Sequence, residues 1–210
     1  MNKLEVIPAF PVIEHINRDE IEIASVMFAE IFKNDLFYLT ILRKNKDFAR
    51  ILQQYFKIAI SLSVANKHAF QVNSYLGGAL FFPPGTTKIS ILRQLILLPK
   101  MLHMFPEGQF FKTLYALNDL QNEQPNEPHF YLCIFGRKDC LSSQHQGIGR
   151  AVLTPTLNLC DQLGFSCYAE FTSEKSAELG EQLGFNIIKE KKFLYSKNLI
   201  LRLGIRPPRV

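Results

Sequence analysis

A continuous run of mostly apolar and aromatic residues at 129–135 (HFYLCIF) constrains the fold of this chain more than any other feature. A run without polar alternation is typical of a strand buried on both faces of its sheet. Helical periodicity follows over 147–163, then a second strand pattern at 166–171 and a helical pattern at 174–183. This alternation of strands and helices predicts an α/β layered architecture with a partly parallel sheet.

The rest of the chain supplies further elements of both kinds. Apolar residues recur at helical spacing in four segments, 18–33, 47–64, 89–104 and 108–120. Strand patterns occupy 69–73, 76–82, 185–190 and 193–197. Because 210 residues lie within the range of one domain and no long linker interrupts them, we expect a single domain over 1–210.

The net charge of +5 is mild and is concentrated after residue 188. The basic residues there are Lys189, Lys191, Lys192, Lys197, Arg202, Arg206 and Arg209. They form either a solvated basic face or a surface that attracts an anion. Aromatic residues are not interleaved with these cations as stacking platforms for bases would require, so we expect no nucleic-acid partner.

Cysteine usage and apolar segments indicate a cytoplasmic protein. The four cysteines contain no CxxC pair and no histidine pair at zinc-ligand spacing, which fits a reducing compartment and predicts no metal site. The start of the chain, MNKLEVIPAF, has no signal-peptide pattern. The most apolar window, 89–105, contains Arg93, Pro99 and Lys100 and is too short and too charged to span a bilayer.

The segment Gln144-His145-Gln146-Gly147-Ile148-Gly149-Arg150 follows the buried strand and opens the next helix. Glycines let the backbone approach a ligand closely, and free amides at a helix N-terminus bind anions such as a pyrophosphate. A tight turn before a helix is the structural alternative. A dinucleotide-binding fingerprint would need a third glycine where Val152 stands, and the Gly-Lys-Ser/Thr of a Walker loop is absent.

In this context the sequence resembles the GNAT superfamily of acetyl-CoA-dependent N-acetyltransferases. Gln144-x-x-Gly147-x-Gly149 matches its Q/R-x-x-G-x-G/A signature, and Leu183-Gly184-Phe185 is similar to the "hGF" before its sixth strand. The resemblance is specific over 128–190 and looser over the rest of 5–200. It implies a central mixed, mostly antiparallel sheet with splayed fourth and fifth strands and helices on both faces.

The resemblance also implies where acetyl-CoA binds. The pyrophosphate would lie on the amides of residues 144–150, with Ser176 nearby on the fourth helix. The pantetheine arm would pair with Cys133, Ile134, Phe135 and Gly136 of the fourth strand. A backbone amide there would polarise the thioester carbonyl.

Direct attack on the thioester requires a neutral amine, so a base must accept its proton. Glu170 and His129 are the candidates. Glu170 is alternatively an ion-pair partner of a lysine, and a histidine beside a buried strand is commonly a structural residue.

The sequence departs from the family on the fourth helix. Gly180 occupies the position of the tyrosine that protonates the leaving thiolate, and Ser176 occupies that of an asparagine. Tyr168, Tyr195 or a water molecule are possible substitutes. We expect either extra room near the thiol at Gly180 or sequence drift in a protein with relaxed chemistry.

On the acceptor side, the resemblance implies a pocket formed by 34–40 and the last hairpin, with Asp35, Phe37 and Tyr38 as substrate-binding residues. Capping of the core by the two aromatic residues is the alternative. The expected function is acetyl transfer to a primary amine of a small molecule, by a monomer or homodimer. The alternatives are a non-catalytic acyl-CoA-binding module and a partner- or membrane-binding scaffold that uses the helices of 89–120.

Overall fold

The computed structural model describes residues 11–86, 99, 102–138, 147–196 and 198–209. All the strands in this part of the chain join one seven-stranded sheet in the order β1-β2-β3-β4-β5-β7-β6. The strands are β1 (Ile13–His15), β2 (Ala69–Val72), β3 (Gly77–Phe82), β4 (His129–Arg137), β5 (Ser166–Phe171), β6 (Asn186–Lys192) and β7 (Ile200–Arg206). Only β4 and β5 run parallel, and the other neighbouring strands are antiparallel. The mixed, mostly antiparallel sheet is therefore confirmed.

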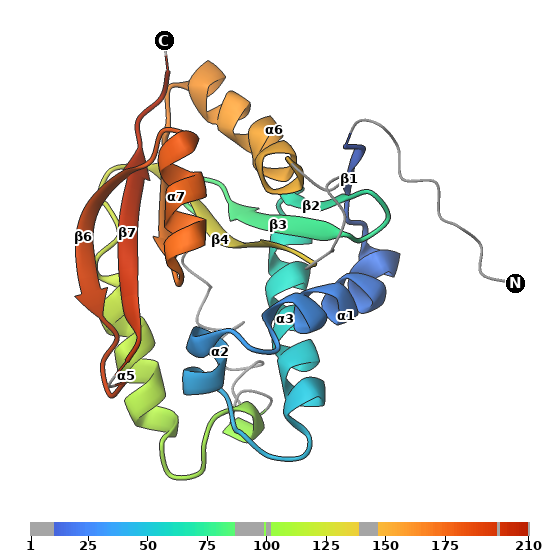
Figure 1. The fold of residues 1–210 in the computed structure, drawn as a ribbon, viewed down its shortest axis with the longest axis vertical. Coiled ribbons are helices and arrows are strands. Elements are labelled where there is room, and N and C mark those ends of the chain that lie inside the picture. Colours follow the sequence, from blue (N-terminus) through green and yellow to red (C-terminus); the bar gives the residue numbers. More distant parts are fainter. Residues whose placement is uncertain (1–10, 87–98, 100–101, 139–146, 197, 210) are drawn as a thin grey trace, which may run out of the picture.

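Helices cover both faces of the sheet, as expected (Figure 1). The α-helices are α1 (Ile21–Phe32), α2 (Leu36–Ile41), α3 (Phe48–Val64), α5 (Phe110–Gln121), α6 (Ile148–Leu163) and α7 (Glu174–Gln182), and a 3-10 helix, η1, spans Arg18–Glu20. Apolar residues of α1, α2, α3 and α5 form one core with the sheet. Those of α6 and α7 form a second core on the opposite face.

Two glycines in the left-handed conformation delimit α6. Gly147 precedes the helix with φ +92°, and Gly164 follows it with φ +71°. Between them, Val152, Leu153 and Leu157 recur at helical spacing and are buried against the sheet. The predicted helix over 147–163 is therefore confirmed, and its N-terminus lies directly at Gly147.

The expected strand at 193–197 is wrong. Phe193–Ser196 forms a turn, in which the Ser196 amide donates to the Phe193 carbonyl and Tyr195 has φ +64°. The last strand is instead β7, which pairs with both β5 and β6. The strand β1 and the helix α2 were not predicted, because each is too short to show a periodic pattern. Most of the predicted helix over 89–104 lies outside the described residues.

Four of the six late basic residues that the structure describes form ion pairs: Lys189, Lys191, Arg202 and Arg206. Lys189 and Lys191 of β6 form ion pairs with Glu123, which lies just after α5, at 2.8 and 2.7 Å. The buried guanidinium of Arg206 binds both carboxylate oxygens of Asp161 at 2.7 Å and so ties β7 to α6. These carboxylates offset the charge of four of the cations from which an anion-binding surface at the C-terminal end would be built.

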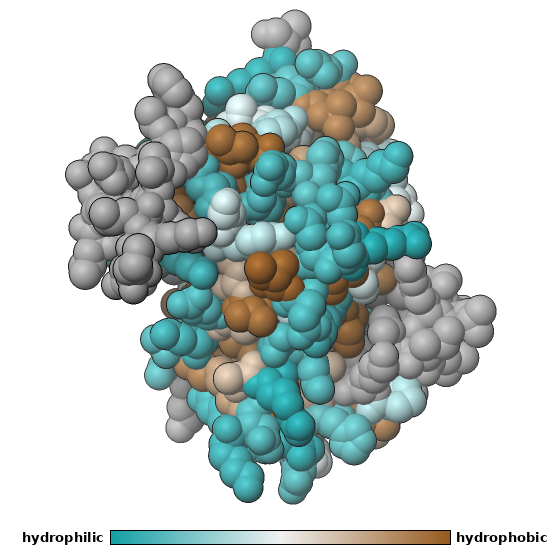
Figure 2. Space-filling view, turned by 90° about the vertical axis from the view of Figure 1, so that its right-hand side faces the viewer, coloured by the Kyte–Doolittle hydropathy of each residue, from teal (hydrophilic) through white to brown (hydrophobic). Residues whose placement is uncertain are grey.

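The face on the right of Figure 1, where α1 and β1 lie, is mostly hydrophilic with small separate hydrophobic patches (Figure 2). None of the helices within the described ranges has the length and apolar character that a membrane crossing requires.

Candidate functional site

The strands β4 and β5 separate halfway along the sheet. Their pairing runs from His129 and Ser166 to Leu132 and Ala169 and then stops. Beyond this point β4 continues to pair with β3, whereas β5 continues with β7. Residues 133–137 of β4 therefore have no β5 partner, which leaves backbone donors and acceptors facing a gap. The expected splay of these two strands is present.

A bulge in β4 coincides with the start of the splay. Leu132 pairs with Phe81 and Ile134 with Leu80, so Cys133 is the extra residue between them. A bulge bends its strand and changes the direction of its side chains. As a result, Cys133 and Ile134 both pack toward the core that contains α1 and α3.

A first cavity, of about 540 Å³, occupies the gap between the splayed strands. Its walls come from the free part of β4, the N-terminus of α6, the first turns of α7 and the end of α1. The described lining includes Cys133, Ile134, Phe135, Gly136, Gly147, Gly149, Arg150 and Ser176, all predicted cofactor-binding residues.

Glycines shape two walls of the first cavity. A Cβ at Gly147 would meet no atom of the described residues within 4 Å, and this exposed glycine lines the cavity at the N-terminus of α6. A Cβ at Gly136 would lie 2.7 Å from Ile31 and 2.9 Å from Phe32, so α1 can approach β4 only because this residue is glycine. An exposed helix N-terminus beside a strand with free backbone groups suits a ligand with an anionic part and an amide-bearing arm.

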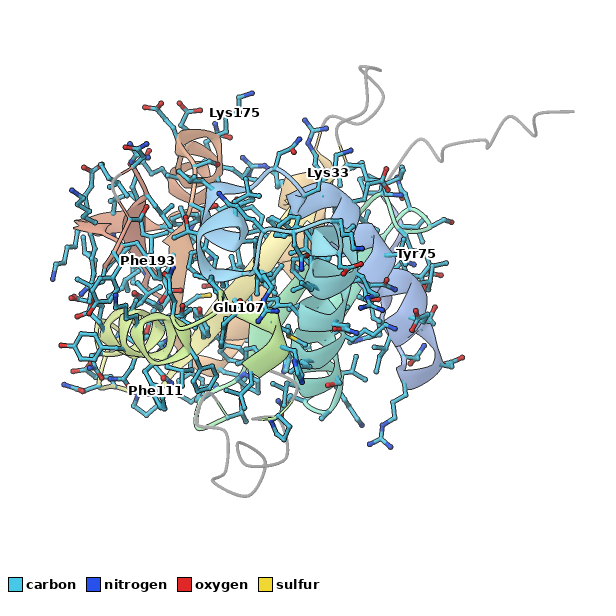
Figure 3. All side chains as sticks on the ribbon, turned by 90° about the horizontal axis from the view of Figure 1, so that it is seen from below. Lys33, Tyr75, Glu107, Phe111, Lys175 and Phe193 are labelled. Carbon is cyan, nitrogen blue, oxygen red and sulfur yellow. The ribbon has the colours of Figure 1, made fainter. Side chains whose placement is uncertain are left out.

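Three cations line the first cavity: Arg137 at the end of β4, Arg150 on α6 and Lys175 on α7. None of them forms an ion pair with a residue that the structure describes. Figure 3 shows Lys175 on the same side of the molecule as Lys33, which follows α1. The described lining residues therefore bring three cations without a described ion-pair partner to this cavity, which favours the binding of phosphate groups.

A second cavity, of about 330 Å³, lies on the other side of β4, among α2, α3, α5 and the sheet. Its lining includes aromatic rings from four elements. The residues that line both cavities are Tyr38, Cys133, Ile134, Glu170 and Thr172. The two cavities therefore meet where β4 and β5 diverge, and we call this place the junction.

Glu170 of β5 lies at the junction and receives a short hydrogen bond. The Tyr131 hydroxyl of β4 donates to its Oε2 atom at 2.6 Å. Burial raises the pKa of Glu170 to about 7, although the hydrogen bond from Tyr131 lowers it in part. A carboxyl group with this pKa can exchange a proton near neutral pH, as a general base must.

The thiol and phenol groups around Glu170 are neutral near pH 7. Burial raises the pKa of the Cys133 thiol to about 12, with a further contribution from Glu170. Burial likewise raises the pKa of Tyr38, Tyr55 and Tyr131 above the usual range. Glu170 is therefore the group at the junction that changes charge in the physiological range.

The three residues predicted for the acceptor divide between the cavities. Phe37 lines the second cavity and Tyr38 lines both. Asp35 lies elsewhere than expected, because it lines the first cavity and not the second. Its carboxylate caps α2 by accepting from the Phe37 amide at 2.9 Å and also accepts from the Thr172 hydroxyl at 2.9 Å. Burial raises its pKa despite these bonds.

His129, Tyr168 and Tyr195 do not line either cavity. The Nδ1 atom of His129 lies 2.8 Å from the Glu127 carbonyl oxygen, and its ring packs on Tyr168, which fits the structural alternative. Tyr168 is fully buried between the sheet and its core. Tyr195 is exposed in the turn after β6. The structure therefore provides Glu170, rather than His129, at the junction.

Gly180 on α7 does not provide room near a thiol. A Cβ at this position would lie 2.4 Å from the ring of Phe171, a buried residue of β5. The same ring lies against Gly204 of β7, where a Cβ would be 2.8 Å away, and against Phe185 at 5.5 Å between centroids. Packing of Phe171 thus explains the glycine, and the expectation of extra room is wrong.

Two other residues predicted to bind the cofactor, Ser176 and Ile148, have structural roles within their own helices. The Ser176 hydroxyl takes part in the capping box of α7, and the Ile148 side chain is buried in the core under α6. Gln144, His145 and Gln146 lie outside the described residues. Tyr131, Arg137 and Lys175 were missed, although alternation along β4 places Tyr131 on the same face as Cys133.

No family model and no curated protein sequence matches this chain. Solved structures do match over nearly its whole length. An acetyltransferase from Corynebacterium glutamicum described as histone acetyltransferase HPA2 and related is 18% identical, with 95% of this chain and 97% of that chain covered and a TM-score of 0.70. Arylalkylamine N-acetyltransferase 2 from Aedes aegypti is 16% identical, with coverages of 95% and 99% and a TM-score of 0.64.

A third match is the polyamine N-acetyltransferase of Drosophila melanogaster, which catalyses the formation of N-acetylagmatine. It is 11% identical, with coverages of 94% and 100% and a TM-score of 0.65. The likeness extends over nearly the full length of all three proteins. The chain has the GNAT acetyltransferase fold.

Proposed function

We propose that this protein is an N-acetyltransferase that moves an acetyl group from acetyl-CoA to a primary amine of a small molecule. The observation that carries the proposal is the meeting of two cavities at Glu170. One cavity has the features of a cofactor site, and the other has the size of a small-molecule pocket.

The donor side is supported by the fit between the first cavity and coenzyme A. The free backbone groups of 133–137 would hold the pantetheine arm as an added strand. The open N-terminus of α6 at Gly147, together with Arg137, Arg150 and Lys175, would hold the phosphates. Acetyl-CoA, when bound, supplies the acetyl thioester.

The acceptor side depends on Glu170 as general base. An ammonium group has no free electron pair, so the carboxylate must accept a proton before the nitrogen can form a bond. Tyr131 orients the carboxylate through its 2.6 Å hydrogen bond and favours the ionised form. A thiol has an ordinary pKa of about 8.5, so a thiolate can leave without the tyrosine that Gly180 replaces.

The test is release of coenzyme A from acetyl-CoA in the presence of primary amines, for the wild type and for Glu170→Gln. We expect the substitution to lower kcat by about 10²–10⁴-fold, as is typical when a general base is lost. Glu178→Gln, on the exposed side of α7 and outside both cavities, is the matched control and should keep the wild-type rate. Equal rates for Glu170→Gln and the wild type would refute Glu170 as the base.

A non-catalytic acyl-CoA-binding module is the second candidate, favoured by the absence of the family's tyrosine at Gly180. It predicts that the wild type binds acetyl-CoA but releases no coenzyme A with any amine. Turnover that depends on Glu170 would exclude it.

A further inference from the structure

The lining of the second cavity carries an inference about the acceptor, and this inference rests on the proposed function. Six aromatic rings face this cavity: Phe37, Tyr38, Tyr55, Phe82, Phe105 and Tyr131. Several pack edge to face, with centroids 5.3 Å apart for Phe37 and Tyr38 and 5.4 Å apart for Tyr38 and Tyr55. Such walls favour an apolar and preferably aromatic occupant.

Among the described residues that line the second cavity, charge is confined to one end. Glu170, at the junction, is the one carboxylate among its described lining residues, and no lysine or arginine occurs among them. Away from the junction, the wall beside α5 consists of Leu117, Leu120 and Gln121 of this helix and of Gln124 just beyond it, which are all uncharged. Asp119 of α5 and Glu123, just beyond the end of this helix, form ion pairs with Lys191 and do not line the cavity.

We infer that the second cavity accepts a primary amine carried on an apolar, ring-sized body without a second cation. The amine would lie at Glu170 and the body among the aromatic rings. A second ammonium group would lose its hydration in the apolar part of the cavity and find no carboxylate among the described walls. Linear diamines should therefore be poor ligands.

The test compares the binding affinities of 2-phenylethylamine and 1,4-diaminobutane for the protein loaded with coenzyme A. Because coenzyme A carries no acetyl group, binding can be measured without reaction. We expect 2-phenylethylamine to bind at least about 100-fold more tightly, since a hydrophobic site discriminates strongly against an unpaired charge. Equal binding of the two amines, or tighter binding of the diamine, would overturn the inference.

A second test adds a carboxylate to the cavity wall and compares diamine binding with that of an uncharged variant at the same position. Leu117 lines only the second cavity and is half-buried, so Leu117→Asp adds a carboxylate away from the junction. It should strengthen diamine binding at least about 10-fold relative to Leu117→Asn, which has nearly the same size without the charge. Ala59→Asp and Ala59→Asn on α3 form a second pair should the first fail to fold. Equal diamine binding by the charged and uncharged members of a folded pair would count against the inference.

Turnover distinguishes failure of this inference from failure of the proposed function. Binding of 2-phenylethylamine without its acetylation from acetyl-CoA would contradict the function but support the acceptor class. Acetylation of the diamine with the higher kcat/KM would support the function but contradict the acceptor class.

Discussion

At the scale of single residues, the pair Tyr131–Glu170 determines what the site can do. The two side chains come from neighbouring strands and meet at 2.6 Å where the cavities join. Burial raises the pKa of the carboxyl group to about 7, and the phenol limits this rise by donating to the ionised form. Under the proposed function, Tyr131 is therefore a positioning residue that would act on the amine through Glu170.

Replacing Tyr131 by Phe should move the pH profile of the reaction. The change removes a hydrogen bond that favours the carboxylate, so the pKa of Glu170 rises further. The base works only when it is ionised, so the acid limb of the kcat/KM profile should shift to higher pH. Relative to the wild type, Tyr131→Phe should therefore lose rate near pH 6.5, and this loss should lessen at higher pH. The measurement is kcat/KM between about pH 6 and pH 9, the range over which such a group titrates.

Tyr115→Phe is the matched control, because this tyrosine is exposed on α5 and lines neither cavity. Its profile should coincide with that of the wild type. A Tyr131→Phe profile lowered equally at every pH would show that the phenol does not act through the titration of Glu170.

At the scale of secondary-structure elements, Phe171 explains how α7 lies on the sheet. Its ring fills the space between Gly180 of α7 and Gly204 of β7, so the helix and the strands approach closely only where both lack a Cβ. The departure from the family pattern at Gly180 is thus a packing feature. It follows that restoring a tyrosine at this position would place its side chain against Phe171 rather than near the thioester.

Gly180→Ala should destabilise the fold even though alanine favours helices over glycine by about 1 kcal/mol. Its Cβ would overlap the buried Phe171 ring, and overpacking of this kind typically costs about 1–3 kcal/mol. We expect a net loss of about 1 kcal/mol in the free energy of unfolding, measured in urea.

A double-mutant cycle separates this effect from helix propensity. In a Phe171→Leu background the smaller side chain leaves space, so Gly180→Ala should no longer destabilise. Glu178→Ala, on the exposed side of the same helix, should leave stability unchanged or slightly higher. Wild-type stability of Gly180→Ala alone would show that the ring can move aside.

At the scale of the whole molecule, sequence reasoning predicted the segments with strong local patterns and missed what tertiary contacts determine. The apolar run of β4 and the periodic face of α6 were recognisable, as were the glycines before that helix. The last strand is 200–206 instead of the predicted 193–197 because it pairs with β5 and β6, and no local pattern records such pairing.

In the candidate site too, residues of a local motif were predicted and contacts between distant residues were missed. Gly147, Gly149 and Arg150 belong to one contiguous motif and were found, as was Glu170 through the family resemblance. The contact of Tyr131 with Glu170 joins residues 39 positions apart, and the placement of Tyr55 depends on how α3 packs against the sheet. The exclusion of His129 from the cavities is also a property of strand register rather than of composition.

The central claim is that acetyl-CoA binds in the first cavity, with its phosphates at the N-terminus of α6. Calorimetric titration of acetyl-CoA into the wild type, Gly147→Glu and Gly164→Glu tests it most directly. The two glycines lie at opposite ends of α6, both have positive φ, and neither would bring a Cβ within 4 Å of another atom of the described residues. Only Gly147 lines the cavity, so Gly164→Glu reproduces the backbone strain and the added charge away from the site.

We predict that the wild type and Gly164→Glu bind acetyl-CoA with Kd values within a few-fold of each other. Gly147→Glu should bind acetyl-CoA at least about 100-fold more weakly, because the new side chain would occupy the space of the phosphates and its negative charge would repel them. Equal affinity of all three proteins, or no binding by the wild type, would contradict the account.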